Sequence, residues 1–250
     1  MFKKLIMIEL KSYFKDYVSC FFTFFVPIII ILTLGHSFGN YQNENGISEI
    51  NNIIATTLVF LITNNGLMAT SAIIGELKER ETLKRYNSIG ISLFKYFLIF
   101  LITQVIIVMI SSIISIITAI IVFKPALTIT LLNSLIISLI LTIGLAIYII
   151  LSYIIVLLTN SVKSATMISS CLFMIMIFSS GVIIPLNQLP NQITNIVQYT
   201  PMYVLLDLII NLWNNTKAYI NAFNINLLII ILYLILLIIS LLLIEKYEKK

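Results

Sequence analysis

Charged side chains are scarce in this sequence: Asp, Glu, Lys and Arg together make up 10% of the 250 residues, whereas 60% are hydrophobic. A soluble domain usually carries about 25% charged residues. The composition therefore excludes an ordinary globular protein and indicates an all-α polytopic membrane protein. The net charge of +5 does not predict a nucleic-acid partner, because the basic residues flank apolar runs, where they orient a protein in a membrane.

Several catalytic and ligand-binding patterns are also missing. No glycine precedes a lysine, so the chain lacks the P-loop that binds ATP phosphates. It has one histidine, His36, and its two cysteines, Cys20 and Cys171, lack metal-ligand spacing. No Asp, Glu, Lys or Arg lies inside the expected membrane spans, which argues against a transporter that is driven by protons or ions through its own residues. We therefore expect no catalytic, cofactor or metal site in this chain, and a separate subunit that supplies energy.

Long apolar runs predict six membrane-spanning helices, since a helix needs about 20 apolar residues to cross the hydrocarbon core. The predicted spans are residues 18–34, 52–74, 96–123, 130–158, 165–184 and 225–244. Residues 1–17 have apolar side chains at helical spacing and predict an interfacial helix; a plain basic flank of the first span is the alternative. Residues 185–221 carry three prolines but stay apolar, which predicts short outer re-entrant helices.

The distribution of basic residues predicts the orientation of these spans. All but two of the 15 Lys and Arg residues fall in segments on one side of the six-span topology, the exceptions being Lys124 and Lys217. Lys and Arg accumulate in loops on the cytoplasmic side of membrane proteins. Both termini are therefore expected in the cytoplasm, and the membrane lipid is one expected partner.

Polar side chains inside the spans form a second group of candidates. An amide in hydrocarbon needs a hydrogen-bond partner, so it should face other helices or a water-filled path. Two interpretations remain open for such residues: they join helices, or they line a path for substrate. The candidates for a substrate path are Asn64, Asn65, Gln104, Ser179 and Ser180.

A charged segment, residues 76–92, separates the second and third spans. Seven ionisable side chains fall within its first ten residues. A short charged segment between two spans lies in water, and its basic residues favour the cytoplasmic side. We expect a cytoplasmic helix that contacts a partner protein; a solvated loop that only sets topology is the alternative.

Three motifs in the chain resemble those of the permease family of type-2 ABC exporters. The inner loop of that family runs approximately E-[KR]-G-T-L-[KE]-R-L-x-A-T-P-[IV]-S, and this chain matches it at Glu79, Arg80, Thr82, Leu83, Lys84, Arg85, Ile91 and Ser92. Glu81 replaces the glycine of that motif and Gly90 replaces the proline. Residues 160–165 resemble the family's N-S-x-x-x-A turn. The outer S-G-x-x-x-P…L-P…P signature is matched by Gly181, Pro185, Pro190 and Pro201.

The resemblance implies a function for the charged segment. In the family it is a coupling helix that is seated in a groove of the ATPase subunit. The implied contacts with an ABC ATPase are Glu79, Arg80, Thr82, Leu83, Arg85 and Tyr86. The working unit would contain two permease chains, identical or related, and two ATPase chains.

The expected function is therefore that of a permease in a bacterial cytoplasmic membrane. Powered by a separate ATPase, it would export an amphipathic drug, an antimicrobial peptide or a lipid-like substrate. The alternative is a non-transporting immunity or sensor subunit that captures a peptide at the outer surface, for which the apolar region 185–213 is the motivation.

Overall fold

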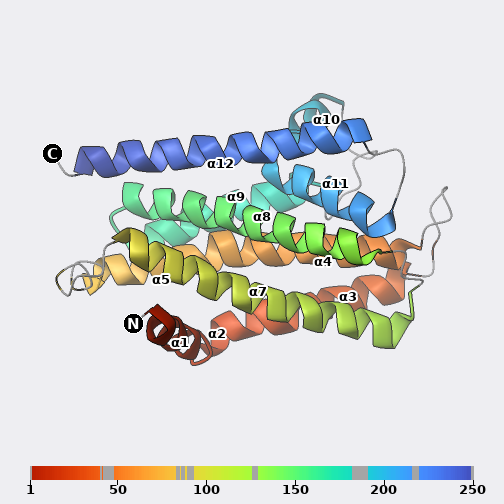
Figure 1. Cartoon of the computed structure of the whole chain (residues 1–250), viewed down its shortest axis with the longest axis horizontal. Helices are drawn as coiled ribbons and strands as arrows, with labels where there is room; N and C mark the ends of the chain where they lie inside the picture. Colours follow the sequence, from red (N-terminus) through yellow and green to blue (C-terminus); the bar gives the residue numbers. More distant parts are fainter. Residues whose placement is uncertain are drawn as a thin grey trace.

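The computed structural model in Figure 1 describes residues 2–39, 41, 48–82, 85, 88, 93–125, 129–181, 191–215 and 220–248. These residues fold into helices, with no β-strand among them. The helices are α1 (Phe2–Tyr13), α2 (Tyr17–Cys20), η1 (Phe21–Phe25), α3 (Val26–Phe38), α4 (Glu49–Thr63), η2 (Asn64–Ala69), α5 (Thr70–Glu79), α7 (Leu93–Phe123), α8 (Leu131–Leu158), α9 (Val162–Ser179), α10 (Asn191–Val197), α11 (Pro201–Asn214) and α12 (Ile220–Glu248).

Five helical stretches in the described part of the chain are long and apolar enough to cross a membrane. They are Tyr17–Phe38, Glu49–Glu79, Lys95–Phe123, Leu131–Leu158 and Val162–Ser179. A shorter apolar stretch, Asn224–Ile239, lies in α12. The predicted all-α fold with several membrane-length helices is confirmed, whereas a sixth span over residues 225–244 stays a prediction.

The long helices run side by side along one axis (Figure 1). α1, the end of α5 and the end of α12 lie at one end of this bundle, which we call the terminal end. α10 and α11 lie at the opposite end. Arg80 and Glu81, which directly follow α5, therefore lie at the same end as α1 and the end of α12.

The first long helix extends further than the predicted span 18–34. It continues through Gly35 and His36 to Phe38. A Cβ atom at Gly35 would lie 2.4 Å from the ring of Phe123, so the glycine permits close contact between α3 and α7 and does not end the helix. The ring of His36 packs edge-on against the same Phe123 at 5.1 Å.

Two π-helical segments, η1 and η2, interrupt the first two long helices, and side chains from both segments meet. Thr23 on η1 donates a hydrogen bond to the amide oxygen of Asn65 on η2 at 2.7 Å. The hydroxyl of Tyr13, which comes from α1, donates to the same oxygen at 2.9 Å. This buried Tyr13–Thr23–Asn65 cluster joins α1 to both long helices, so Asn65 acts as a helix-joining residue.

Backbone carbonyls in and next to the π segments find side-chain donors nearby. The hydroxyl of Thr70 donates to the carbonyl of Asn65 at 2.8 Å. Ser111 on α7 donates to the carbonyl of Thr23 at 2.5 Å. A buried carbonyl without a partner costs about 1–3 kcal/mol, so these hydroxyls stabilise an irregular backbone inside an apolar bundle.

α11 packs inside the bundle and contacts α4, α8 and α12. Its N-cap is Thr200 and Pro201 occupies its first turn, where the missing N–H has no helical partner to lose. Three side-chain hydrogen bonds tie it to its neighbours: Asn214 to Asn52 at 2.9 Å, Asn133 to the carbonyl of Leu212 at 2.9 Å and Asn226 to Asp207 at 2.7 Å.

Within the predicted outer signature, Pro201 begins α11 and Gly181, with a φ of 81°, follows α9, whereas Pro185 and Pro190 lie outside the described residues.

We predict that Asn65→Leu destabilises the fold by about 1–2 kcal/mol, because it removes the acceptor that Tyr13 and Thr23 share in an apolar environment. Thermal unfolding of the purified chain in detergent measures this loss. Asn195→Leu is the matched control, since Asn195 is exposed on α10. Equal melting temperatures for the two variants would contradict the proposed role of the cluster.

Candidate functional site

The last turn of α5 holds the first four residues of the charged segment. The helix that includes the second predicted span continues to Glu79, so residues 76–79 belong to it and not to a separate helix. The chain then turns at Arg80 and Glu81, and Glu81 has a φ of 55°. Side chains with a Cβ atom rarely adopt this left-handed conformation, and glycine adopts it freely. The turn therefore falls at the position where the exporter motif has glycine and this chain has Glu81.

Lys78 caps the end of α8. Its Nζ donates to the carbonyl oxygens of Val156 at 2.8 Å, Leu157 at 3.0 Å and Thr159 at 2.9 Å. The last carbonyls of a helix lack partners within the helix and carry its partial negative charge. The ammonium group therefore satisfies three acceptors and complements the helix dipole.

Glu79 contacts the beginning of the next helix, α9. Its Oε1 accepts a hydrogen bond from the backbone N–H of Val162 at 2.7 Å. Ser161, the N-cap of α9, accepts from the N–H of Ser164 at 3.2 Å. A carboxylate is favourable at this end of a helix because the unpaired N–H groups carry partial positive charge.

Two adjacent residues of α5 thus contact both sides of the α8–α9 turn. The positive Lys78 lies at the negative end of α8, and the negative Glu79 lies at the positive end of α9. Lys78 and Glu79, together with Gly75 and the turn, line a small cavity of about 170 Å³. The charged segment and the N-S-x-x-x-A turn are about 80 residues apart in sequence, yet they meet here. We call this pair of contacts the Lys78–Glu79 clamp.

The other residues predicted to contact an ATPase follow the clamp in the sequence. Arg80 forms an ion pair with Glu76 at 3.5 Å, and 75% of its side chain is exposed. Such exposed pairs contribute about 0–1 kcal/mol, so Arg80 remains free to exchange partners. Arg85 is exposed and Thr82 is half-buried. Leu83 and Tyr86 lie outside the described residues.

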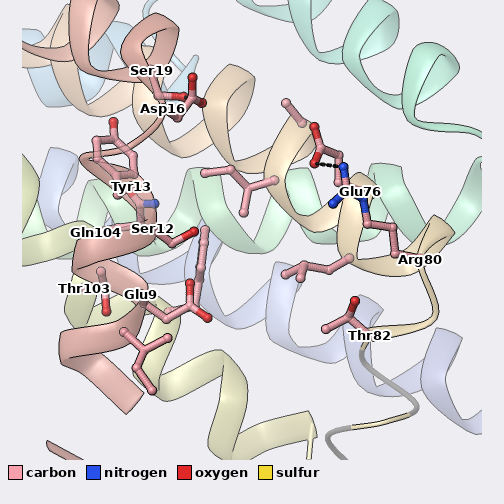
Figure 2. Close-up of a pocket in the computed structure, with 15 residues that line it drawn as sticks. Glu9, Ser12, Tyr13, Asp16, Ser19, Glu76, Arg80, Thr82, Thr103 and Gln104 are labelled. Atoms are coloured by element: carbon pink, nitrogen blue, oxygen red, sulfur yellow. Dashed lines mark hydrogen bonds and ion pairs between the residues drawn. The ribbon is translucent and has the colours of Figure 1, made fainter. Parts of the chain in front are cut away.

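A larger cavity of about 460 Å³ opens between α1, α5 and α7. We call it the α1 cavity. Figure 2 shows Glu9, Ser12 and Tyr13 on one side of it and Glu76, Arg80 and Thr82 on the other. The hydroxyl of Tyr96 donates to Glu9 Oε1 at 3.2 Å. Burial raises the pKa of the Glu9 carboxyl, and the hydrogen bond from Tyr96 opposes that effect.

The candidates for a substrate path do not form one surface. Gln104, with 1% of its surface exposed, lines the α1 cavity, and Asn65, fully buried, bonds to Tyr13 of the same cavity. Asn64 is buried beside Asn65 on η2. Ser179 and Ser180 lie at the end of α9, where they donate to the carbonyls of Met176 and Ile177 of their own helix.

Sequence reasoning missed the clamp and the α1 cavity. Glu9 carried a signal, because it is an acidic residue in a segment that otherwise reads as a basic interfacial helix. Nothing in the sequence pairs Glu9 with Tyr96, or Lys78 with the end of α8, since each pair is more than 75 residues apart. Among the described residues, no group of three or more His, Cys, Asp or Glu side chains could hold a metal ion.

A family model matches most of the chain. The model described as ABC-2 type transporter covers residues 1–213, a range that contains α1, the Lys78–Glu79 clamp, the α1 cavity and nearly all of α11. No curated protein matches the chain.

Removing the cation of the clamp should loosen the α8–α9 turn. We predict that Lys78→Met lowers stability by about 2 kcal/mol, because three carbonyls lose a charged donor at the negative end of a helix. Backbone amide exchange at residues 157–162 should accelerate more than exchange at the centre of α8. Lys163→Met, which changes an exposed lysine on α9, is the control, and equal exchange in both variants would argue against the clamp.

The raised pKa of Glu9 predicts a pH dependence of stability. The folded chain keeps the Glu9 proton to a higher pH than the unfolded chain does, so stability falls as pH rises from about 4.3, the ordinary glutamate pKa, through the raised value. Glu9→Gln should flatten this part of the curve. Tyr96→Phe should steepen it, because it removes the hydrogen bond that favours the carboxylate. Denaturant unfolding at several pH values measures all three slopes, and an unchanged slope in Glu9→Gln would contradict the assignment.

Proposed function

Because the chain belongs to the ABC-2 type transporter family, we propose that it exports an amphipathic drug, an antimicrobial peptide or a lipid-like substrate across the bacterial cytoplasmic membrane. The family assignment makes the chain a membrane protein and a permease subunit of an ABC transporter. The permease itself is not catalytic, and ATP hydrolysis belongs to a separate ATPase subunit. Family members assemble as dimers of membrane subunits, and here the second permease is a second copy or a related chain.

The Lys78–Glu79 clamp carries this proposal. The proposed coupling helix, residues 76–92, begins within the last turn of α5, and this turn is bonded to the end of α8 and to the beginning of α9. A displacement of the segment by an ATPase would therefore act on three long helices together. Two side chains bonded to rigid helix ends transmit force better than a flexible loop does, because packed elements move as units.

The contacts with the ATPase are proposed at Glu79, Arg80, Thr82, Leu83, Arg85 and Tyr86. The exposure of Arg80 and Arg85 supports a docking role, since exposed charges steer association with a partner of opposite charge. Glu79 has one carboxylate oxygen on α9, so its role is to link the interface to the bundle.

The proposed orientation places the terminal end of the bundle in the cytoplasm. The end of α5 lies at that end, together with α1 and the end of α12 (Figure 1). Most of the basic residues belong to segments at this end, as expected for the cytoplasmic side. Amphipathic cargo is preferred over simple ions because the predicted spans carry no Asp, Glu, Lys or Arg.

The alternative, capture of a peptide by a non-transporting subunit, has less support from the packing. Its motivation was the apolar region 185–213, but Val204, Leu205, Ile209 and Trp213 are buried inside the bundle. Peptide binding or protection of the cell that persists when the ATPase is catalytically inactive would favour capture over export.

We predict that Leu83→Asp leaves membrane insertion intact yet abolishes substrate-dependent ATP hydrolysis, because a charge replaces the apolar side chain proposed to fill the ATPase groove. The assay is ATP hydrolysis by the reconstituted complex with and without substrate. Ile196→Asp changes an exposed apolar residue at the opposite end of the bundle and is the control. Normal coupling in Leu83→Asp, or loss of coupling in both variants, would count against the proposed interface.

A further inference from the structure

The α1 cavity combines a suitable size with an excess of negative charge. Its volume of about 460 Å³ falls within the range of small-molecule sites, which is about 300–1,000 Å³. The charged residues that line it are Glu9, Asp16, Glu76 and Arg80. The guanidinium of Arg80 is already paired with Glu76. Among the described residues, Asp16 accepts hydrogen bonds from two neutral donors, the N–H of Val18 and the hydroxyl of Ser19. The cavity therefore favours a cation.

An independent observation indicates which kind of cation fits. Gln104 on α7 lines the cavity and is 1% exposed, and its amide oxygen is buried with no hydrogen-bond partner within the described part of the chain. A buried acceptor of this kind costs about 1–3 kcal/mol when it is left unpaired. A ligand with N–H donors would satisfy it, whereas a cation without N–H groups would not.

We propose that the α1 cavity binds the ammonium group of a primary or secondary amine. The amide oxygen of Gln104 and the carboxylate of Glu9 accept hydrogen bonds from the ammonium N–H groups, and Asp16 adds negative charge. Charge-assisted hydrogen bonds of this kind are about twice as strong as neutral ones.

The remaining walls indicate what is attached to the ammonium group. Ile73 and Leu77 from α5 and Phe100 from α7 also line the cavity, so a short alkyl chain would pack against apolar side chains. Both a soluble amine and the ethanolamine headgroup of a membrane lipid carry this chemistry. The cavity lies against α1, the predicted interfacial helix, where either source can reach it. The inference does not depend on export, because binding alone is proposed.

The test is equilibrium binding to the full chain in nanodiscs of phosphatidylcholine, a lipid whose headgroup has no N–H donor. The probe is n-butylammonium, and n-butyltrimethylammonium has the same charge without N–H groups. We expect saturable binding of n-butylammonium by calorimetry and at least tenfold weaker binding of the trimethyl compound. No ATPase is present, so the result is separate from the test of the coupling segment.

Variants locate the site within the chain. Glu9→Gln and Gln104→Leu should each weaken binding of n-butylammonium at least tenfold. Glu49→Gln and Gln198→Leu, which lie outside the residues that line the cavity, should bind as the native chain does. Melting temperatures verify that each variant is folded, and Glu9→Gln keeps the size of the side chain, so this variant tests the site even if Gln104→Leu does not fold.

A second arm identifies the source of the amine. When phosphatidylethanolamine replaces half of the lipid, weaker apparent binding of n-butylammonium would assign the site to the lipid headgroup, and unchanged binding would assign it to soluble amines. No saturable binding, equal binding of the two probes, or native binding by both Glu9→Gln and Gln104→Leu would overturn the proposal.

Discussion

A backbone carbonyl inside an apolar bundle has no water to bond with, and this constraint decides much of the structure. At three places where a helix departs from regular α geometry or ends, a side chain supplies the missing donor. Thr70 and Ser111 do this at the two π segments, and Lys78 does it at the end of α8. The polar residues of this sequence are few, and several of them lie where the backbone requires them.

The same constraint applies at the Lys78–Glu79 clamp. Lys78 and Glu79 are neighbours in sequence, and each has the charge opposite to that of the helix end that it contacts. A permease that receives energy from another subunit needs a stiff connection between its docking surface and its membrane helices. In the function proposed above, the clamp is that connection, because its two side chains lie where the charged segment leaves α5.

The sequence was sufficient to predict the all-α fold, because helix length and apolar periodicity are local properties. The outer signature named Pro201 as a motif residue, but the motif did not indicate that a long helix begins there. The sequence could not predict that the first long helix continues through Gly35, because the packing of Gly35 on Phe123 depends on a contact 88 residues away. The clamp and the α1 cavity were missed for the same reason: each depends on residues that are distant in sequence. Asn65 was correctly singled out as needing a partner, but its partners, Tyr13 and Thr23, were not predictable from local pattern.

The π segments have a geometric consequence for motion. A π turn contains an extra residue relative to an α turn, and one residue corresponds to about 100° of rotation about an α-helix axis. If η2 relaxed to α geometry, the part of the helix on one side of it would rotate by roughly that angle relative to the other. The hydrogen bond between Thr23 and Asn65 joins η2 to η1. While that bond is kept, the two segments would rotate together, and Tyr13 of α1 would stay bonded to Asn65.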